Sequence, residues 1–94
     1  MINDNSTIVL TDYSHCQYID GFHFVYVEKT NETIVLDSDL NFILDKLKSG
    51  DSTIAELISL AQLIFTSEAN SDIAAFIETN VDNLVAQNII KFHN

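Results

Sequence analysis

Hydrophobic positions in the first half of the chain follow the two-residue period of β-strands. Residues 7–11 form a short β-branched run, and residues 22–28 alternate regularly between two faces. A turn ending at Asn31, which can adopt a left-handed conformation, leads into a second hairpin arm over residues 33–36. The segment 12–21 is longer than a tight turn, and we expect a crossing loop there with room for further strand.

The alternation over residues 22–28 gives this strand two apolar faces. One face carries Phe22, Phe24 and Tyr26, and the other carries His23, Val25 and Val27. We expect His23 to be a half-buried aromatic side chain of the sheet.

The second half of the chain follows the 3.6-residue period of helices and predicts three of them. The first begins with Asp37 or Ser38 as its N-cap and ends at Gly50, where a left-handed residue is favourable. The second begins at a capping box, because the Thr53 hydroxyl and the Glu56 carboxylate can each accept an orphan backbone N–H.

The third helix begins with Asn70 or Ser71 as its N-cap and ends near Asn88, a residue suited to the left-handed C-terminal position. Residues 89–92 then form a short extended tail. The apolar positions that mark the three helices are Leu40, Ile43, Leu44 and Leu47, then Leu57, Ile58, Leu60, Ala61, Ile64 and Phe65, then Ile73, Phe76, Ile77, Val81, Leu84 and Val85, the last set being expected to point inward.

This order of three strands, three helices and a tail predicts one α+β domain over residues 1–94, with its core over about 7–92. We expect a winged-helix-like architecture, in which a small antiparallel three-stranded sheet is followed by three helices. A chain of this length has room for a single hydrophobic core.

Charge narrows the range of partners. The chain has 94 residues and carries four lysines, no arginine and fourteen acidic residues, for a formal net charge of −10. Phosphate backbones and anionic membranes are bound through several cationic contacts, so we expect neither as a partner. The hydrophobic content of 47% is that of a globular domain rather than of a disordered acidic tail.

The sequence predicts a cytoplasmic location. Cys16 is the only cysteine, which excludes an intrachain disulfide and suits a reducing compartment. The first residues lack the basic and apolar regions of a signal peptide. The most apolar stretch, residues 57–65, is much shorter than the roughly 20 residues of a membrane span.

The only cluster that could suggest nucleophilic chemistry is Ser14-His15-Cys16, with Asp12 and Asp20 nearby. No further residue completes a catalytic constellation, so we expect a loop thiol and a surface imidazole. A metal site built from His15, Cys16, His23 and His93 would lack the ligand spacings typical of metal-binding motifs. We therefore expect no enzymatic activity, no cofactor and no metal.

Several short motifs together resemble a known family. They are Phe24-Val25-Tyr26, Thr33, Leu36-Asp37, Ile43-Leu44, Leu47, Gly50, Thr53-Ile54-Ala55-Glu56-Leu57 and Leu84-Val85-Ala86-Gln87-Asn88-Ile89-Ile90. Over about residues 7–92 the chain resembles the PqqD family of peptide chaperones, or RiPP recognition elements, and within it the subtype associated with HPr-kinase-like proteins. It departs from the family at Asn31 and Asn88, where glycine is common, at Ser38, where proline is common, and at Asn41, where a small apolar residue is usual.

The resemblance implies a non-catalytic peptide chaperone. Such a domain binds the leader segment of a ribosomally synthesised precursor peptide and presents the peptide to a modifying enzyme. The leader would add as an extra strand to the exposed edge of the hairpin, at Glu32, Thr33, Ile34, Val35 and Leu36. The wall of the neighbouring groove would be Ile73, Ala74, Ile77 and Val81 of the third helix.

Two other functions stay open at the level of sequence. One is a generic protein–protein adaptor. The other is a winged-helix nucleic-acid-binding regulator, although residues 71–88 contain no lysine or arginine and carry Asp72, Glu78 and Asp82. A homodimer formed through two exposed strands is compatible with each function. An acidic third helix beside the groove also predicts a bound peptide that is apolar with basic flanks.

Overall fold

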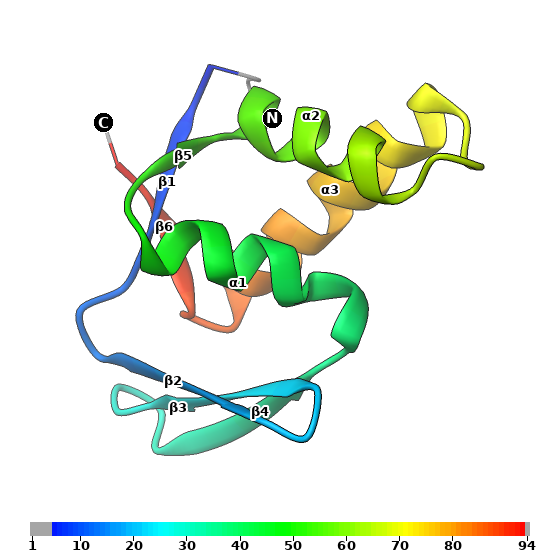
Figure 1. Cartoon of the computed structure of the whole chain (residues 1–94). Coiled ribbons are helices and arrows are strands. Elements are labelled where there is room, and N and C mark those ends of the chain that lie inside the picture. Colours follow the sequence, from blue (N-terminus) through cyan, green and yellow to red (C-terminus); the bar gives the residue numbers. More distant parts are fainter. Residues whose placement is uncertain (1–4, 94) are drawn as a thin grey trace.

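The computed structural model describes residues 5–93, and in this part of the chain it contains two small antiparallel sheets and three α-helices (Figure 1). The elements are β1 (Thr7–Leu10), β2 (Ser14–Ile19), β3 (Phe22–Val27), β4 (Glu32–Leu36), the 3₁₀-helix η1 (Ser38–Leu40), α1 (Asn41–Lys48), β5 (Ser52–Thr53), α2 (Ile54–Ile64), α3 (Asn70–Ala86) and β6 (Ile90–Phe92). The predicted α+β class is confirmed.

One sheet, with strand order β2–β3–β4, forms the lower layer of Figure 1. β2 occupies most of the segment expected to be a crossing loop and pairs with β3 along its whole length. The two strands are joined by Asp20 and Gly21, both at positive φ, which is the backbone of a type I′ hairpin turn. The expected hairpin between β3 and β4 is confirmed, and Asn31 in its turn is left-handed.

The second sheet corrects the expectation that the first predicted strand belongs with the hairpin. β1 instead lies between β5 and the C-terminal strand β6, in the order β5–β1–β6. Thr11 holds this arrangement, because its backbone N–H donates to the Ile89 carbonyl at 3.0 Å and its hydroxyl donates to the Asn88 carbonyl at 2.8 Å. The expected C-terminal tail is therefore a paired strand, and the chain turns after Thr11 to begin a separate sheet.

The core lies between the β2–β3–β4 sheet and the helices above it. α1 covers the inner face of this sheet, α2 lies above α1 in Figure 1, and α3 packs against α2 and slopes from the level of α2 down to that of α1. On β3 the face with His23, Val25 and Val27 is the buried one. The aromatic face of the same strand points away from the helices, which leaves Phe22 and Tyr26 exposed.

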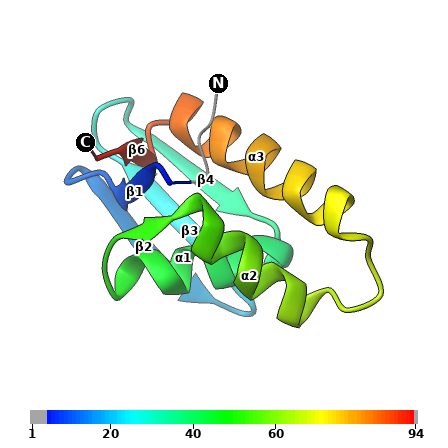
Figure 2. The ribbon, with the colours of Figure 1, turned by 90° about the horizontal axis from the view of Figure 1, so that it is seen from above.

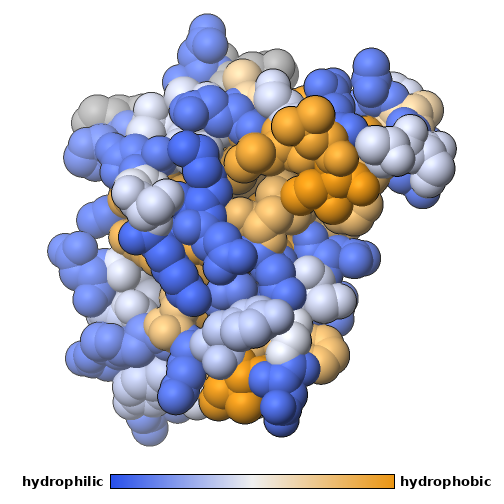
Figure 3. All heavy atoms as spheres, viewed as in Figure 1, coloured by the Kyte–Doolittle hydropathy of each residue, from blue (hydrophilic) through white to orange (hydrophobic). Residues whose placement is uncertain are grey.

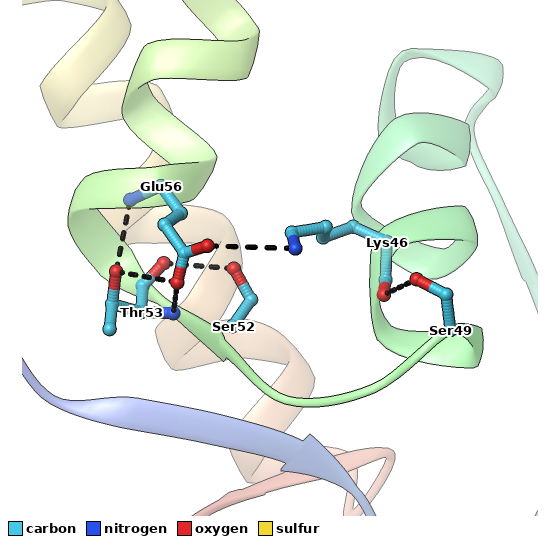
Figure 4. Close-up of polar contacts among 5 residues, drawn as sticks. All are labelled: Lys46, Ser49, Ser52, Thr53 and Glu56. Atoms are coloured by element: carbon cyan, nitrogen blue, oxygen red, sulfur yellow. Dashed lines mark hydrogen bonds and ion pairs between the residues drawn. The ribbon is translucent and has the colours of Figure 1, made fainter.

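The start of α2 follows its sequence signal closely. Thr53 is the N-cap, and its hydroxyl accepts the Glu56 backbone N–H at 3.1 Å. The Glu56 carboxylate in turn accepts the Thr53 backbone N–H at 3.0 Å, which completes the capping box (Figure 4). Lys46 of α1 approaches the other carboxylate oxygen at 3.6 Å and links the two helices.

The other two helix starts differ from the prediction. α3 has Ala69 as its N-cap, and neither Asn70 nor Ser71 caps it because both are already helical. Asp37 precedes η1 without a side-chain cap, and a 3₁₀ turn leads into α1. Both predicted C-terminal signals are confirmed, since Gly50 and Asn88 have positive φ just after their helices.

Candidate functional site: a free strand edge

β4 is an end strand of its sheet and offers main-chain groups along one edge. The Glu28 N–H donates to the Tyr13 carbonyl at 2.9 Å, which extends the β2–β3 ladder and shows that even-numbered residues of β3 point toward β2. Because main-chain groups alternate along a strand, the odd-numbered residues of β3 point toward β4. Their partners in the register are Glu32, Ile34 and Leu36. Thr33 and Val35 therefore direct their N–H and C=O groups outward.

The side chains of β4 divide between the two faces of the sheet. Leu36 is buried and Ile34 is half-buried on the inner face, where they join the core. Thr33 and Val35 lie on the outer face opposite Tyr26 and Phe24, and 54% of Val35 is exposed. A strand added at this edge would extend an outer face that is already aromatic and open.

The structure corrects part of the predicted groove wall on α3. Ile77 and Val81 are completely buried in the core, so their side chains hold the helix in place rather than line a groove, whereas Ile73, also buried, contributes to the lining of a hollow described below. They point inward because they share the apolar stripe of the helix with Leu84. Ala74 is half-buried at the border of this stripe.

A hollow of about 250 Å³ does lie near the end of β4, on the other side of the α3 stripe from Ala74. Residues 74 and 76 differ by about 200° around a helix, and it is Phe76 that faces the hollow. The lining residues are Asp39, Phe65, Glu68, Asp72, Ile73 and Phe76. Seen from above, α3 runs along the same edge of the sheet as β4 (Figure 2).

This hollow was not predicted as a site. Phe65 and Phe76 read as ordinary apolar positions of two helices, and their ring centroids do lie 5.7 Å apart in an edge-to-face contact. The only sign of the hollow in the sequence was the pair of acidic residues Glu68 and Asp72 near the start of α3, and only the fold brings Asp39 to the same place.

A buried polar network fixes the hairpin against α1. His23 is completely buried rather than half-buried, which corrects the prediction. Asn41 donates from Nδ2 to the Gly21 carbonyl at 2.9 Å, so its Oδ1 accepts from Nδ1 of His23 at 2.8 Å. The remaining nitrogen, Nε2, accepts from the Lys48 ammonium at 3.0 Å. Asn41 thus has a specific role, because it links the turn before β3, the buried His23 and α1.

The candidate nucleophile and base do not converge. His15 and Cys16 are neighbours on β2, so their side chains point to opposite faces of the sheet. His15 pairs with Glu28 at the surface. Cys16 lies in a strand rather than in the expected loop, and burial raises the pKa of its thiol, with a smaller opposing effect from Lys48. Ser14 hydrogen-bonds to Thr11.

Within residues 5–93 the structure shows neither a metal-binding cluster nor a membrane-spanning helix. No three His, Cys, Asp or Glu side chains in this range are grouped so that they could hold a metal ion. None of the helices in the same range has both the length and the apolar character needed to cross a membrane.

Comparisons with protein-family models, with curated proteins and with solved structures gave no match to this chain.

Proposed function

We propose that this protein is a non-catalytic peptide-recognition domain that binds the leader segment of a ribosomally synthesised precursor peptide by strand addition at β4. The observation that carries the proposal is the edge of β4, which no strand within residues 5–93 pairs with and where Thr33 and Val35 direct main-chain donors and acceptors away from the sheet. Strand addition uses such groups for affinity and the alternating side chains for specificity.

The surroundings of β4 support this edge as the binding site. An added strand would place alternate side chains next to Thr33 and Val35 on the outer face, and the others on the side where α3 runs along the sheet (Figure 2). The bound peptide would then be presented, in the cytoplasm, to a modifying enzyme. Nothing in this role requires a metal, a cofactor or a catalytic side chain.

The edge can be tested with two matched proline substitutions. Val35→Pro removes an outward N–H of β4, and Tyr18→Pro removes an outward N–H of β2, the other end strand of the sheet. Edge strands tolerate proline at such positions. We expect Val35→Pro to weaken binding of a candidate leader peptide by roughly fivefold, since it removes one main-chain hydrogen bond and such bonds contribute about 1 kcal/mol each. Tyr18→Pro should bind like the unmodified protein, as measured by calorimetric titration.

Amide hydrogen exchange gives a second readout that needs no substitution. Peptide binding should slow exchange at Thr33 and Val35 and leave Cys16 and Tyr18 unchanged. Protection at β2 instead, or loss of binding only in Tyr18→Pro, would show that the peptide binds at β2 and that our proposal names the wrong edge. Unaltered affinity in folded Val35→Pro would exclude strand addition at β4.

A further inference from the structure

An apolar groove lies where η1 and α1 meet the end of α2 and the start of α3. It consists of the hollow beside Phe76 and an adjoining hollow of about 320 Å³, which share Asp39 and Phe65 as lining residues. Its apolar lining residues are Phe42, Ile64, Phe65, Ile73 and Phe76. Phe65 contacts both Phe42 and Phe76 edge-to-face, with ring centroids 5.9 and 5.7 Å apart, so the floor is a continuous aromatic surface.

The apolar surface extends out of the groove onto α2. Figure 3 shows hydrophobic residues gathered over the C-terminal half of this helix, with hydrophilic residues around them. Ile64 lines the groove and is 51% exposed, and Leu63 beside it is 76% exposed. Exposed apolar patches of this kind mark interaction sites in soluble proteins.

The charges around the groove define the occupant. Its rim carries four carboxylates, from Asp39, Asp45, Glu68 and Asp72, and no lysine lines it. Within residues 5–93 the ion pairs leave Asp39, Glu68 and Asp72 without a basic partner. A second copy of this chain would bring another net charge of −10 toward the same rim, so self-association is opposed. A cationic partner is attracted.

We propose that this acid-rimmed groove binds a cationic amphipathic helix of a partner protein. The walls are helices rather than strand edges, so the fitting mode is a helix laid into a groove, with apolar anchors at i, i+3, i+4 and i+7. The anchors contact the aromatic floor, and Lys or Arg side chains on both flanks of the helix meet the four carboxylates. The groove is separate from the main-chain edge of β4, and the proposal does not depend on strand addition.

The probe for this surface is a labelled peptide of about 15 residues, the shortest length at which isolated helices become marginally stable, with Leu at the anchor positions and Lys elsewhere. Binding is measured by fluorescence anisotropy against the full chain. A peptide with Glu in place of every Lys is the charge control. We expect saturable binding of the Lys peptide, weakening as salt rises, and none of the Glu peptide.

Two triple variants distinguish the effect of the rim carboxylates on binding from the effect of the net charge of the chain. Asp39→Asn/Glu68→Gln/Asp72→Asn removes three rim charges, and Asp51→Asn/Glu78→Gln/Asp82→Asn removes three charges elsewhere. Each changes the net charge from −10 to −7. The rim variant should weaken binding of the Lys peptide by about tenfold, the sum of three modest exposed ion pairs, and the control by less than about threefold.

The apolar lining of the groove is tested at two neighbouring exposed residues. These variants also test the proposal if the rim variant folds poorly. Ile64→Ser should weaken binding, whereas Leu63→Ser, outside the groove, should weaken it less. Val35→Pro should leave binding of this probe unchanged. Equal weakening by both triple variants or by both serine variants would overturn the proposal. A dissociation constant above about 1 mM for the Lys peptide would also overturn the proposal. So would a homodimer that Ile64→Ser dissociates in sedimentation.

Discussion

Single residues decide how the hairpin is attached to the rest of the molecule. The His23 imidazole is buried on β3, and both of its nitrogens have partners, Asn41 and Lys48, on α1. Asn41 also reaches the Gly21 carbonyl in the turn between β2 and β3. One amide side chain therefore connects a turn, a strand and a helix, and it holds in place the sheet whose edge strand is β4.

The first prediction at this scale concerns Asn41. Asn41→Leu removes the two hydrogen bonds that the Asn41 amide makes, one to the Gly21 carbonyl and one with Nδ1 of the buried His23. We expect a loss of about 1–3 kcal/mol in the free energy of unfolding, measured by urea denaturation. Asn83→Leu, at an exposed position of α3, is the matched control and should change stability by less than about 0.5 kcal/mol. Equal effects of the two substitutions would show that the network is not stabilising.

At the scale of elements, local side-chain signals identified some boundaries and misplaced others. The Thr53–Glu56 capping box was predicted because both partners lie within four residues of each other, and it forms as expected. The starts of η1 and α3 lack any side-chain cap, although Asp37, Asn70 and Ser71 are good capping residues. A residue suited to capping was therefore not sufficient to produce a side-chain cap at these two positions.

The capping box predicts a pH dependence of stability. The Thr53 backbone N–H, its hydroxyl and Lys46 hold the pKa of the Glu56 carboxyl below its usual value of 4.5. A carboxyl with a lowered pKa in the folded state stabilises the fold above its unfolded pKa, and this contribution is lost as pH falls through the folded value. Glu56→Gln should therefore be less stable than the unmodified protein at pH 7, and the difference should shrink below about pH 4.5.

The measurement is a series of urea unfolding curves between neutral and acidic pH. Glu68→Gln, which removes an acid outside the box, is the control and should not show the same convergence. A constant difference between Glu56→Gln and the unmodified protein at all pH values would contradict a role for the charged carboxylate.

At the scale of the whole molecule, the excess of acidic residues works against compactness. With fourteen acidic and only four basic residues, repulsion between the negative charges outweighs attraction to the positive ones. Only two of the ion pairs within residues 5–93 join side chains that are both at least partly exposed. The same excess opposes binding of phosphate backbones and favours cationic partners at the groove rim.

This imbalance predicts a stabilisation by salt. Raising NaCl from about 0.1 to 1 M shortens the screening length from roughly 10 to 3 Å and weakens the repulsion. We expect the melting temperature to rise, by about 4–8 °C for each 1 kcal/mol gained in a domain of this size. Circular dichroism melts provide the measurement. The variant Asp51→Asn/Glu78→Gln/Asp82→Asn should respond less, and a melting temperature that falls with salt would contradict the prediction.

Local patterns along the sequence were sufficient for the β3–β4 hairpin, the three helices, the capping box and the left-handed Asn31 and Asn88. Each depends on residues close together in the chain. The hairpin arm over residues 33–36 was also predicted from its pattern, whereas the exposed edge over Glu32–Leu36 was implied by the family resemblance, and the structure places β4 at the end of its sheet. Its use by a peptide stays a prediction.

Tertiary structure alone decided what depends on distant residues. Both faces of β3 are apolar, so only packing against α1 could determine that the His23 face is buried and the Phe24 face points outward. β1 joins β5 and β6 through pairings with distant residues, and just beyond β1 Thr11 hydrogen-bonds to Asn88 and Ile89, almost eighty residues away. The acid-rimmed groove likewise combines three separate helical segments. Such juxtapositions leave no periodic signal in the sequence, because each depends on the complementarity of surfaces that meet only in the folded chain.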